Sequence, residues 1–274
     1  MKLPENIDKI TLIEDKEIGP FPPNGFQKFE EASFGNGDYF GLYWEFGKEH
    51  QEPIICEILH DEGIIMPRFS CLNKFLEWYQ LNDYDWGEDE IDDDAFVLNL
   101  IKKGGNQLKQ SQTKQALAYY KQSTDVFGEY SENWYKLALL HEKDGNQLEF
   151  QKSIINAIFS NWAIQHPSEN ALYTLKNIHP VGALKQHPLI KNRNIFDLHF
   201  GGVKENKIYT IISEILSELN VIEDIDKALI MEQNYALMMH RETTSFQERY
   251  HFNLEQWQSD FKQKTNHRLK LKQK

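Results

Sequence analysis

The sequence has little of what several protein classes require. Its 274 residues include only two cysteines, Cys56 and Cys71, which excludes a disulfide scaffold and favours a reducing compartment. No stretch approaches the ~18 consecutive apolar residues that a membrane-spanning helix needs. The N-terminal residues carry acids early and contain no apolar run, so we expect no signal peptide. These absences predict a cytoplasmic protein without a membrane partner.

Catalytic motifs are also missing. The sequence contains no phosphate-binding GxxxxGK[ST] loop, no HExxH, no GxSxG and no CxxC. Cys56 lies in an apolar stretch, where a small buried side chain is the expected role. His60, followed by Asp61 at the end of an expected strand, could act as a base or ligand, but no second ligand cluster supports it. We therefore expect no cofactor, no metal ion and no catalysis, and keep an enzyme with scattered residues around His60 as a third alternative.

What the sequence does have is an uneven distribution of charge. Hydrophobic residues make up 40% of the chain, enough for packed cores, and the length suggests two domains. Residues 1–96 hold 23 acidic and 7 basic side chains, a net charge of −16, whereas residues 97–274 have a net charge of +4. An acidic front third repels the phosphates of nucleic acid and attracts a basic protein surface. The charge pattern therefore indicates a protein partner and argues against nucleic acid.

The N-terminal third has the pattern of a small α+β domain. The segment 39–46 alternates, which predicts a strand with one strongly apolar face. That face carries Phe40, Leu42, Trp44 and Phe46. Further strands are expected at 54–59 and at 64–66, with Pro67 ending the last one. A helix capped by Ser70 is expected to close this antiparallel meander.

The segment 83–94, DYDWGEDEIDDD, holds eight acidic side chains among its twelve residues. A run of like charges repels itself, so it forms a solvated linker, a surface loop or an acidic binding patch. Asp94 could also cap the helix that follows. Trp86 is the expected anchor, because aromatic residues among charges often dominate interface energies. The residues expected to contact a partner are Asp83, Asp85, Trp86, Glu88, Asp89, Glu90, Asp92, Asp93 and Asp94.

Residues 95–200 show a helical repeat with a constant offset of 34 residues, which is the tetratricopeptide period. Small residues at corresponding positions let paired helices approach, and large residues fill the gaps between them. The matching pairs are Leu100 and Trp134, Gly104 and Ala138, Ala116 and Phe150, Tyr120 and Ile154, and Ser123 and Ala157. A degenerate third unit begins at Ser168. Stacked hairpins of this kind are expected to offer a concave binding surface.

Residues 201–274 are expected to continue as helices. Apolar side chains at helical spacing predict one helix over 208–219, and another is expected over 222–240. A capping box at 245–248 predicts a helix whose apolar stripe runs to Phe261. The last 13 residues hold six basic side chains and no acid, and are expected to form a frayed, solvated end. The chain is thus divided into 1–82, 83–94, 95–200 and 201–274.

Residues 20–80 resemble the SUKH superfamily, which groups fungal cell-wall synthesis regulators with bacterial immunity proteins. The resemblance rests on the glycine turn at 35–38, the aromatic strand 40–44, the strand 53–60 and the closing element 69–78. It implies a function carried out by binding, because the bacterial members neutralise polymorphic toxins, many of them nucleases, without chemistry of their own. A nuclease is basic where it holds phosphate, so an acidic protein can occupy that surface.

Two functions of different classes follow from these observations. The first is a bacterial immunity protein that binds and neutralises a cognate basic toxin, such as a nuclease. The second is a scaffold or regulatory protein whose helical repeats bind a housekeeping partner. An immunity gene should lie beside a toxin gene and be needed only when that toxin is present, and a scaffold should show neither property.

Overall fold

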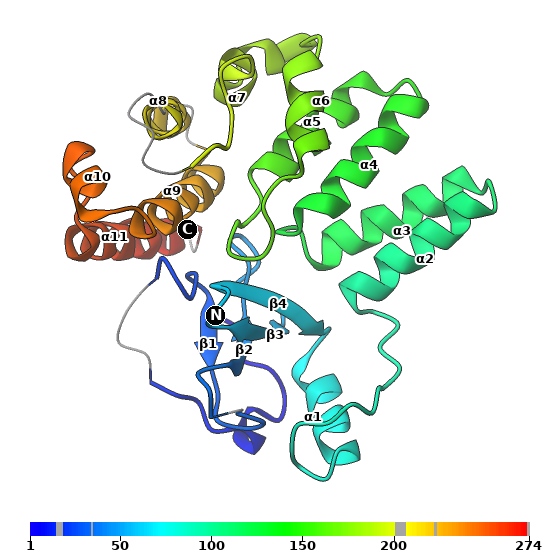
Figure 1. Ribbon diagram of the computed structural model, residues 1–274. Coiled ribbons are helices and arrows are strands. Elements are labelled where there is room, and N and C mark those ends of the chain that lie inside the picture. The colour runs from blue at the N-terminus through cyan, green and yellow to red at the C-terminus, as the bar shows by residue number, and fades with distance from the viewer. Residues whose placement is uncertain (15–18, 34, 201–206, 222–223, 273–274) are drawn as a thin grey trace.

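The N-terminal third folds as the antiparallel meander that its alternating residues predict (Figure 1). The computed structural model describes residues 1–14, 19–33, 35–200, 207–221 and 224–272. Each strand is antiparallel to its neighbour, in the order β1-β2-β3-β4. The elements are the 3-10 turn η1 (Ile7–Lys9), β1 (Phe26–Lys28), β2 (Tyr39–Tyr43), β3 (Ile54–Leu59), β4 (Ile64–Phe69) and the closing helix α1 (Leu72–Leu81).

Strand β4 lies at the edge of the sheet and contains a proline. Pro67 was expected to end this strand, but the strand continues to Phe69. Pro67 lies opposite Cys56, and its missing N–H falls on the outward side of the edge, where no ladder hydrogen bond is lost. The N–H of Ile65 faces the same side and donates to the carbonyl of Ala163 at 2.8 Å. The prediction was wrong because a proline breaks a central strand and not an edge strand.

One face of the sheet packs against α1. Phe40 of β2 and Phe69 of β4 are buried together with Phe75 and Trp78 of the helix. The ring centroid of Phe40 lies 5.2 Å from that of Phe75 and 5.5 Å from that of Trp78. This aromatic cluster is the core that the alternation in segment 39–46 predicted.

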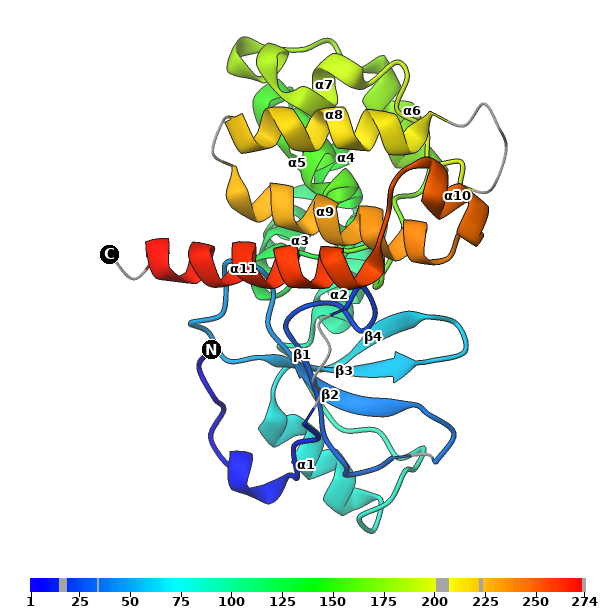
Figure 2. The same cartoon turned by 90° about the vertical axis from the view of Figure 1, so that its left-hand side faces the viewer.

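The opposite face of the sheet is covered by helices from the rest of the chain. Tyr43, Cys56 and Ile65 are buried there together with residues of the helical region, such as Phe127. The expected burial of Cys56 is confirmed. The sheet therefore lies between α1 on one side and the helical region on the other (Figures 1 and 2).

Residues 97–192 fold into paired helices. Helix α2 packs along α3, α4 packs along α5, and α3 also contacts α4. A Cβ added at Gly104 would lie 3.1 Å from the Tyr120 ring, so the glycine permits this approach. The corresponding Ala138 is fully buried. The bounds are α2 (Val97–Lys109), α3 (Thr113–Val126), α4 (Ser131–Lys143), α5 (Gln147–Ile158), α6 (Glu169–Asn177), η2 (Gly182–Gln186) and α7 (Pro188–Asn192). The expected class, a small antiparallel sheet followed by helical hairpins, is confirmed.

Helices from the C-terminal region pack against these hairpins (Figure 2). Ile154 of α5 shares one hydrophobic core with Ile212 of α8 and Leu237 of α9. One side of the hairpins, expected to form an open concave surface, is thus filled by the chain itself. The bounds are α8 (Ile208–Val221), α9 (Ile225–His240), α10 (Thr244–Arg249) and α11 (Leu254–Lys272). Among the described helices, none is both long and apolar enough to cross a bilayer.

The segment after α9 forms two helices where the capping box predicted one. The first of them, α10, begins at Thr244, one residue before the predicted cap Ser245, and ends at Arg249. His251 then adopts a positive φ of 52°, which interrupts the helix before α11 begins. The side chain of Asn253 accepts a hydrogen bond from the N–H of Gln256 at 2.8 Å and so caps α11. The stripe of apolar residues across this break is a shared packing face and not a continuous helix.

Residues 262–272 belong to an anchored helix and not to the frayed end that their basic composition suggested, and residues 273–274 lie outside the described part of the chain. Helix α11 continues to Lys272, and Arg268 is only 2% exposed. Its guanidinium donates to the carboxylates of Glu49 and Asp226. It also lies 5.5 Å from the ring centroid of Phe46. Phe46 was expected on the α1 face, but it packs beside α11 because β2 ends before it.

Arg268 should therefore contribute to the stability of the whole fold. In Arg268→Ala, two carboxylates lose their buried cation, and the free energy of unfolding should fall by about 2–4 kcal/mol. Urea denaturation would measure the change. Lys262→Ala, an exposed position on the same helix, is the matched control and should be close to wild type. Equal stability of the two variants would contradict the anchoring role of Arg268 and would support a solvated end.

Candidate protein-binding groove

The acidic segment 83–94 is an ordered loop that folds back on the end of α1. Asp83 and Tyr84 both have positive φ values, 55° and 62°, which reverse the chain directly after the helix. Asn82 then ties the loop to itself. Its side-chain amide donates to the Asp89 carbonyl at 3.3 Å, and its Oδ1 accepts from the Asp89 N–H at 3.2 Å. The segment is therefore a surface loop with a defined shape and not a free linker.

Asp93 points into the protein, unlike the other predicted contact residues. Its carboxylate accepts hydrogen bonds from the Ser70 N–H at 2.7 Å and the Ser70 hydroxyl at 2.6 Å. Asp93 is 5% exposed, so it fastens the loop to the end of β4 and is not available to a partner. Ser70 was expected to cap α1, but the helix begins at Leu72 with Cys71 at the N-cap, and the Ser70 hydroxyl donates to Asp93 instead.

Asp94 is exposed and forms an ion pair with Lys103 of α2, with 2.6 Å between Oδ1 and Nζ. The side chain of Lys103 lowers the pKa of this carboxyl through its hydrogen bond and its charge. Asp94 does not cap α2, since the N-cap of that helix is Phe96. Part of the charge of the Asp94 carboxylate is therefore already balanced by Lys103 of the same chain.

A hollow of about 460 Å³ lies between the loop, β4, α1 and the start of α2; we call it the acidic groove. Its apolar lining includes Met66, Phe69, Trp78, Ile91 and Leu98. Of the predicted contact residues, five line it: Trp86, Glu88, Asp89, Glu90 and Asp93. The remaining predicted contacts, Asp83, Asp85, Asp92 and Asp94, are exposed on the loop outside this lining.

The acidic groove combines an apolar lining with a negative rim. Glu88, Asp89 and Glu90 are exposed, and Trp86 is 45% exposed beside them. Arg68 also lines the groove, and its guanidinium lies 3.3 Å from the Glu57 carboxylate, which balances its charge. The three acids therefore set the sign of the local potential. An arrangement of this kind can hold a basic side chain at the rim and an apolar group below it.

The edge of β4 offers little to a strand that would extend the sheet. On the outward side, Pro67 has no N–H and the N–H of Ile65 already donates to Ala163. The N–H of Ser70, just after the strand, donates to Asp93. Recognition in the acidic groove therefore depends on side chains and not on strand addition.

His60 is held between two carboxylates at the end of β3. Its Nδ1 lies 2.9 Å from Asp38 and its Nε2 lies 3.0 Å from Asp61. Burial raises the pKa of Asp38, but hydrogen bonds from His60 and Asn36 outweigh it and lower that pKa overall. In the described part of the chain, no group of three or more metal-ligating side chains is found. The geometry gives His60 a role in tying a strand end to the preceding turn.

A buried polar network joins the sheet to the helical region. Glu129, which follows α3, accepts from the Tyr43 hydroxyl, from the Asn161 amide at 3.1 Å and from the Phe46 N–H at 3.2 Å. The amide of Asn161 also donates to the Tyr43 oxygen at 2.8 Å. Two segments more than eighty residues apart are thus fastened by one carboxylate.

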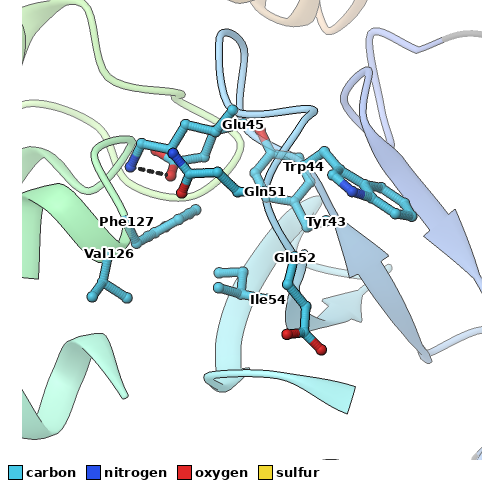
Figure 3. Close-up of a pocket in the computed structure, with 9 residues that line it drawn as sticks. Tyr43, Trp44, Glu45, Gln51, Glu52, Ile54, Val126 and Phe127 are labelled. Atoms are coloured by element: carbon cyan, nitrogen blue, oxygen red, sulfur yellow. Dashed lines mark ion pairs between the residues drawn. The ribbon is translucent and has the colours of Figure 1, made fainter. Parts of the chain in front are cut away.

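Glu45 completes this network from the sheet side. Its carboxylate accepts from the Gly128 N–H at 2.6 Å and pairs with the ammonium of Lys48 at 2.6 Å. Burial raises the pKa of Glu45 to about 8, and it also raises the pKa of Glu129. Glu45 also lines a small cavity of about 20 Å³. Figure 3 shows Tyr43 on the sheet side of this cavity and Phe127 on the helical side.

Sequence reasoning missed this network because its members are distant along the chain. Tyr43 and Glu45 alternate with the apolar residues of segment 39–46, so they fall on its other side, where both are buried in the folded protein. The available signal was weak: Glu45 lies within an aromatic run, and Glu129 lies between Gly128 and Tyr130 in a short connection. Neither sequence pattern indicates which residues the glutamate contacts in the folded protein.

Comparison with known proteins places the chain in a family. Residues 12–88 match the model of the YfbP N-terminal domain, and residues 199–272 match that of the YfbP C-terminal domain. A protein of Escherichia coli strain K12, described as uncharacterized protein YfbP, is 37% identical over 268 residues, covering 96% of this chain and 95% of the relative. The chain belongs to the YfbP family. The YfbP N-terminal match covers the sheet, α1 and part of the acidic loop, and the C-terminal match covers α8–α11.

Asp93 should be a structural residue of the acidic loop. Asp93→Ala leaves the Ser70 N–H and hydroxyl without their acceptor, which should cost about 1–3 kcal/mol and loosen the loop. Hydrogen exchange of the amides in segment 83–94 would report this as faster exchange. The neighbouring exposed control, Asp92→Ala, should exchange like wild type. Equal protection in both variants would contradict the inward role of Asp93.

Glu45 should make stability depend on pH. In the folded protein the Glu45 carboxyl keeps its proton up to about pH 8. In the unfolded chain the same carboxyl releases the proton near its usual pKa of 4.5. The free energy of unfolding therefore falls as the pH rises between these values. Thermal unfolding measured at several pH values in this window should show that the stability of Glu45→Gln declines less with rising pH than that of wild type. The control Glu149→Gln, at a side chain that is 41% exposed, should keep the wild-type decline. Parallel curves for wild type and Glu45→Gln would contradict the assignment.

Proposed function

We propose that this YfbP-family protein acts by binding a basic segment of a partner protein in the acidic groove, without catalysis of its own. The observation that carries the proposal is an exposed acidic rim on a hollow of about 460 Å³ with an apolar lining. A partner that places lysine or arginine at the rim and an apolar side chain inside would match both features. Trp86 is the expected anchor, because it is half exposed at the groove and large enough to bury substantial area.

Charge beyond the groove supports the same partner. The first 96 residues have a net charge of −16, and no described basic side chain at the rim other than the paired Arg68 opposes the acids. A field of one sign speeds the encounter with a basic surface, and its effect falls as salt is added. We expect capture of the partner to be fast and salt-dependent.

The partner that we propose is a cognate toxin, which makes this chain an immunity protein. The support is the resemblance of residues 20–80 to the SUKH superfamily together with the acidity of the groove. A toxin that acts on nucleic acid must carry a basic surface for phosphate, and an acidic protein bound there would block it. This reading predicts a need for the protein only in cells that meet the toxin.

A second candidate is a scaffold for a housekeeping partner, favoured by a separate hollow on the helical hairpins. It measures about 430 Å³ and lies between α6 and residues 197–199. Tyr173, which is 70% exposed, and Leu172 line it. A peptide of a partner could lie there independently of the acidic groove.

Capture from a native cell lysate tests the proposal. The tagged protein should retain a partner with a basic domain at low salt and less of it at about 0.3 M salt, where exposed charges are screened. The triple variant Glu88→Gln, Asp89→Asn, Glu90→Gln should retain at least ~10-fold less, because it removes the charge of the rim. Trp86→Ala should weaken capture by a similar amount.

A charge-matched control separates the groove from net charge. The variant Glu142→Gln, Asp144→Asn, Glu149→Gln removes three acids near the end of α4 and the start of α5, away from the groove, and should capture like wild type. If both triple variants lost captured partner equally, the effect would be due to net charge alone. That result would contradict binding in the acidic groove. Retention that depends on Tyr173 instead would favour the scaffold. A toxin gene beside this gene, with protection lost in the groove variant, would favour immunity.

A further inference from the structure

A hollow of about 190 Å³ lies where the β2–β3 connection, the α3–α4 connection and α9 meet; we call it the carboxylate cleft. Two buried glutamates line it, Glu45 at 6% exposure and Glu129 at 3%. Three aromatic side chains also line it: Phe46, Trp134 and Phe159. The cleft is separate from the acidic groove, with which it shares no lining residue.

The carboxylate cleft holds more buried acidic groups than close cations. Lys48 is the cation paired with Glu45, whereas Glu129 is held by neutral donors: a hydroxyl, an amide and a backbone N–H. Lys227 of α9 lies at the cleft as well, but its ammonium is 3.5 Å from the Asp224 carboxylate. Among the described residues, two buried carboxyl groups therefore share one close ammonium. Burial raises the pKa of both groups, so near neutral pH a proton on Glu45 stands where a second cation would be needed.

The oxygens of these carboxylates retain capacity to accept hydrogen bonds. Both oxygens of Glu45 and Oε1 of Glu129 each receive one donor from the described residues. A carboxylate oxygen has two lone pairs, so each can accept once more. Aromatic rings beside carboxylates form the usual surroundings of an organic cation, because the ring faces and the carboxylates both attract positive charge.

We propose that the carboxylate cleft binds a small primary alkylammonium compound, with its ammonium between Glu45 and Glu129 and its methylene groups along the aromatic side chains. The volume limits the ligand to a few carbon atoms beyond the ammonium. The positive charge of the ligand takes the place of the proton that Glu45 holds near neutral pH. Free diamines and free lysine share this chemistry, and the experiment separates them.

Titration of the full-length protein with putrescine tests the proposal. Isothermal titration calorimetry should give saturable binding of one putrescine, at least ~10-fold tighter than 1,4-butanediol, which has the same chain without charge. Free lysine carries a carboxylate as well, so weaker binding of lysine would identify a diamine as the source. Equal binding of putrescine and butanediol would overturn the proposal.

Variants locate the bound ammonium. Glu45→Gln and Glu129→Gln should each weaken binding at least ~10-fold, through loss of a charge-assisted contact. Lys227→Gln, at a partly exposed position, should strengthen it about 2- to 5-fold because a like charge is removed from the cleft. Glu149→Gln on the surface of α5 is the control and should bind like wild type. Unchanged affinity in Lys227→Gln and in either glutamate variant would also overturn the proposal, so the test holds if one glutamate variant fails to fold.

Proton release offers an independent measurement. The titratable groups around Glu45 are Lys48 from its own connection, Tyr43 and Cys56 from the sheet, Glu129 from the α3–α4 connection and Lys227 from α9. Because the pKa of Glu45 is about 8, an ammonium bound near neutral pH should displace its proton. Calorimetry in two buffers of different ionisation enthalpy should report release of up to one proton, absent in Glu45→Gln. Binding without proton release would place the ligand elsewhere.

Discussion

Both faces of the four-stranded sheet are buried, and the second face is covered by helices that come later in the chain. One face is closed locally by α1, through the cluster around Phe40 and Phe75. The other closes only when Tyr43 and Cys56 meet Phe127 and neighbouring residues. The polar network of Glu45, Glu129 and Asn161 lies at that junction, so its buried carboxylates are satisfied only when sheet and helices are together. This constraint makes the two regions one packed unit.

The acidic groove depends on the same constraint. Strand β4 is held at its edge by the hydrogen bond from Ile65 to Ala163 of the helical region. The loop is then held against the end of β4 by Asp93 and Ser70, and beside α2 by Asp94 and Lys103. A run of like charges, which by itself would extend into solvent, is thereby given a fixed shape. Fixed acids lose less entropy on binding than a free linker would, which suits a recognition surface.

The local patterns of the sequence predicted most of the elements, but not β1 or the break between α10 and α11. Alternation at 39–46 predicted β2, and the 34-residue offset paired Gly104 with Ala138 in helical hairpins. The predictions were wrong where a residue type can take two different structural roles. Pro67 was taken as a strand end, yet an edge strand accepts it. Asp93 was counted with its exposed neighbours, although one of eight acids could turn inward once Ser70 offered two donors. The basic C-terminal segment was expected to fray, but it is helical because the Arg268 guanidinium donates to two carboxylates.

By itself the sequence determined the α+β class, most of the strands and helices, the burial of Cys56 and the acidity of the front third. These follow from periodicity and composition, which act over a few residues. Only the tertiary structure decided which faces meet. The contacts of Glu129 with Tyr43, of Arg268 with Glu49 and of Gln233 with Asn24 join residues more than eighty positions apart. No local pattern specifies such pairs, because a buried polar group needs a partner of suitable chemistry and the chain offers many.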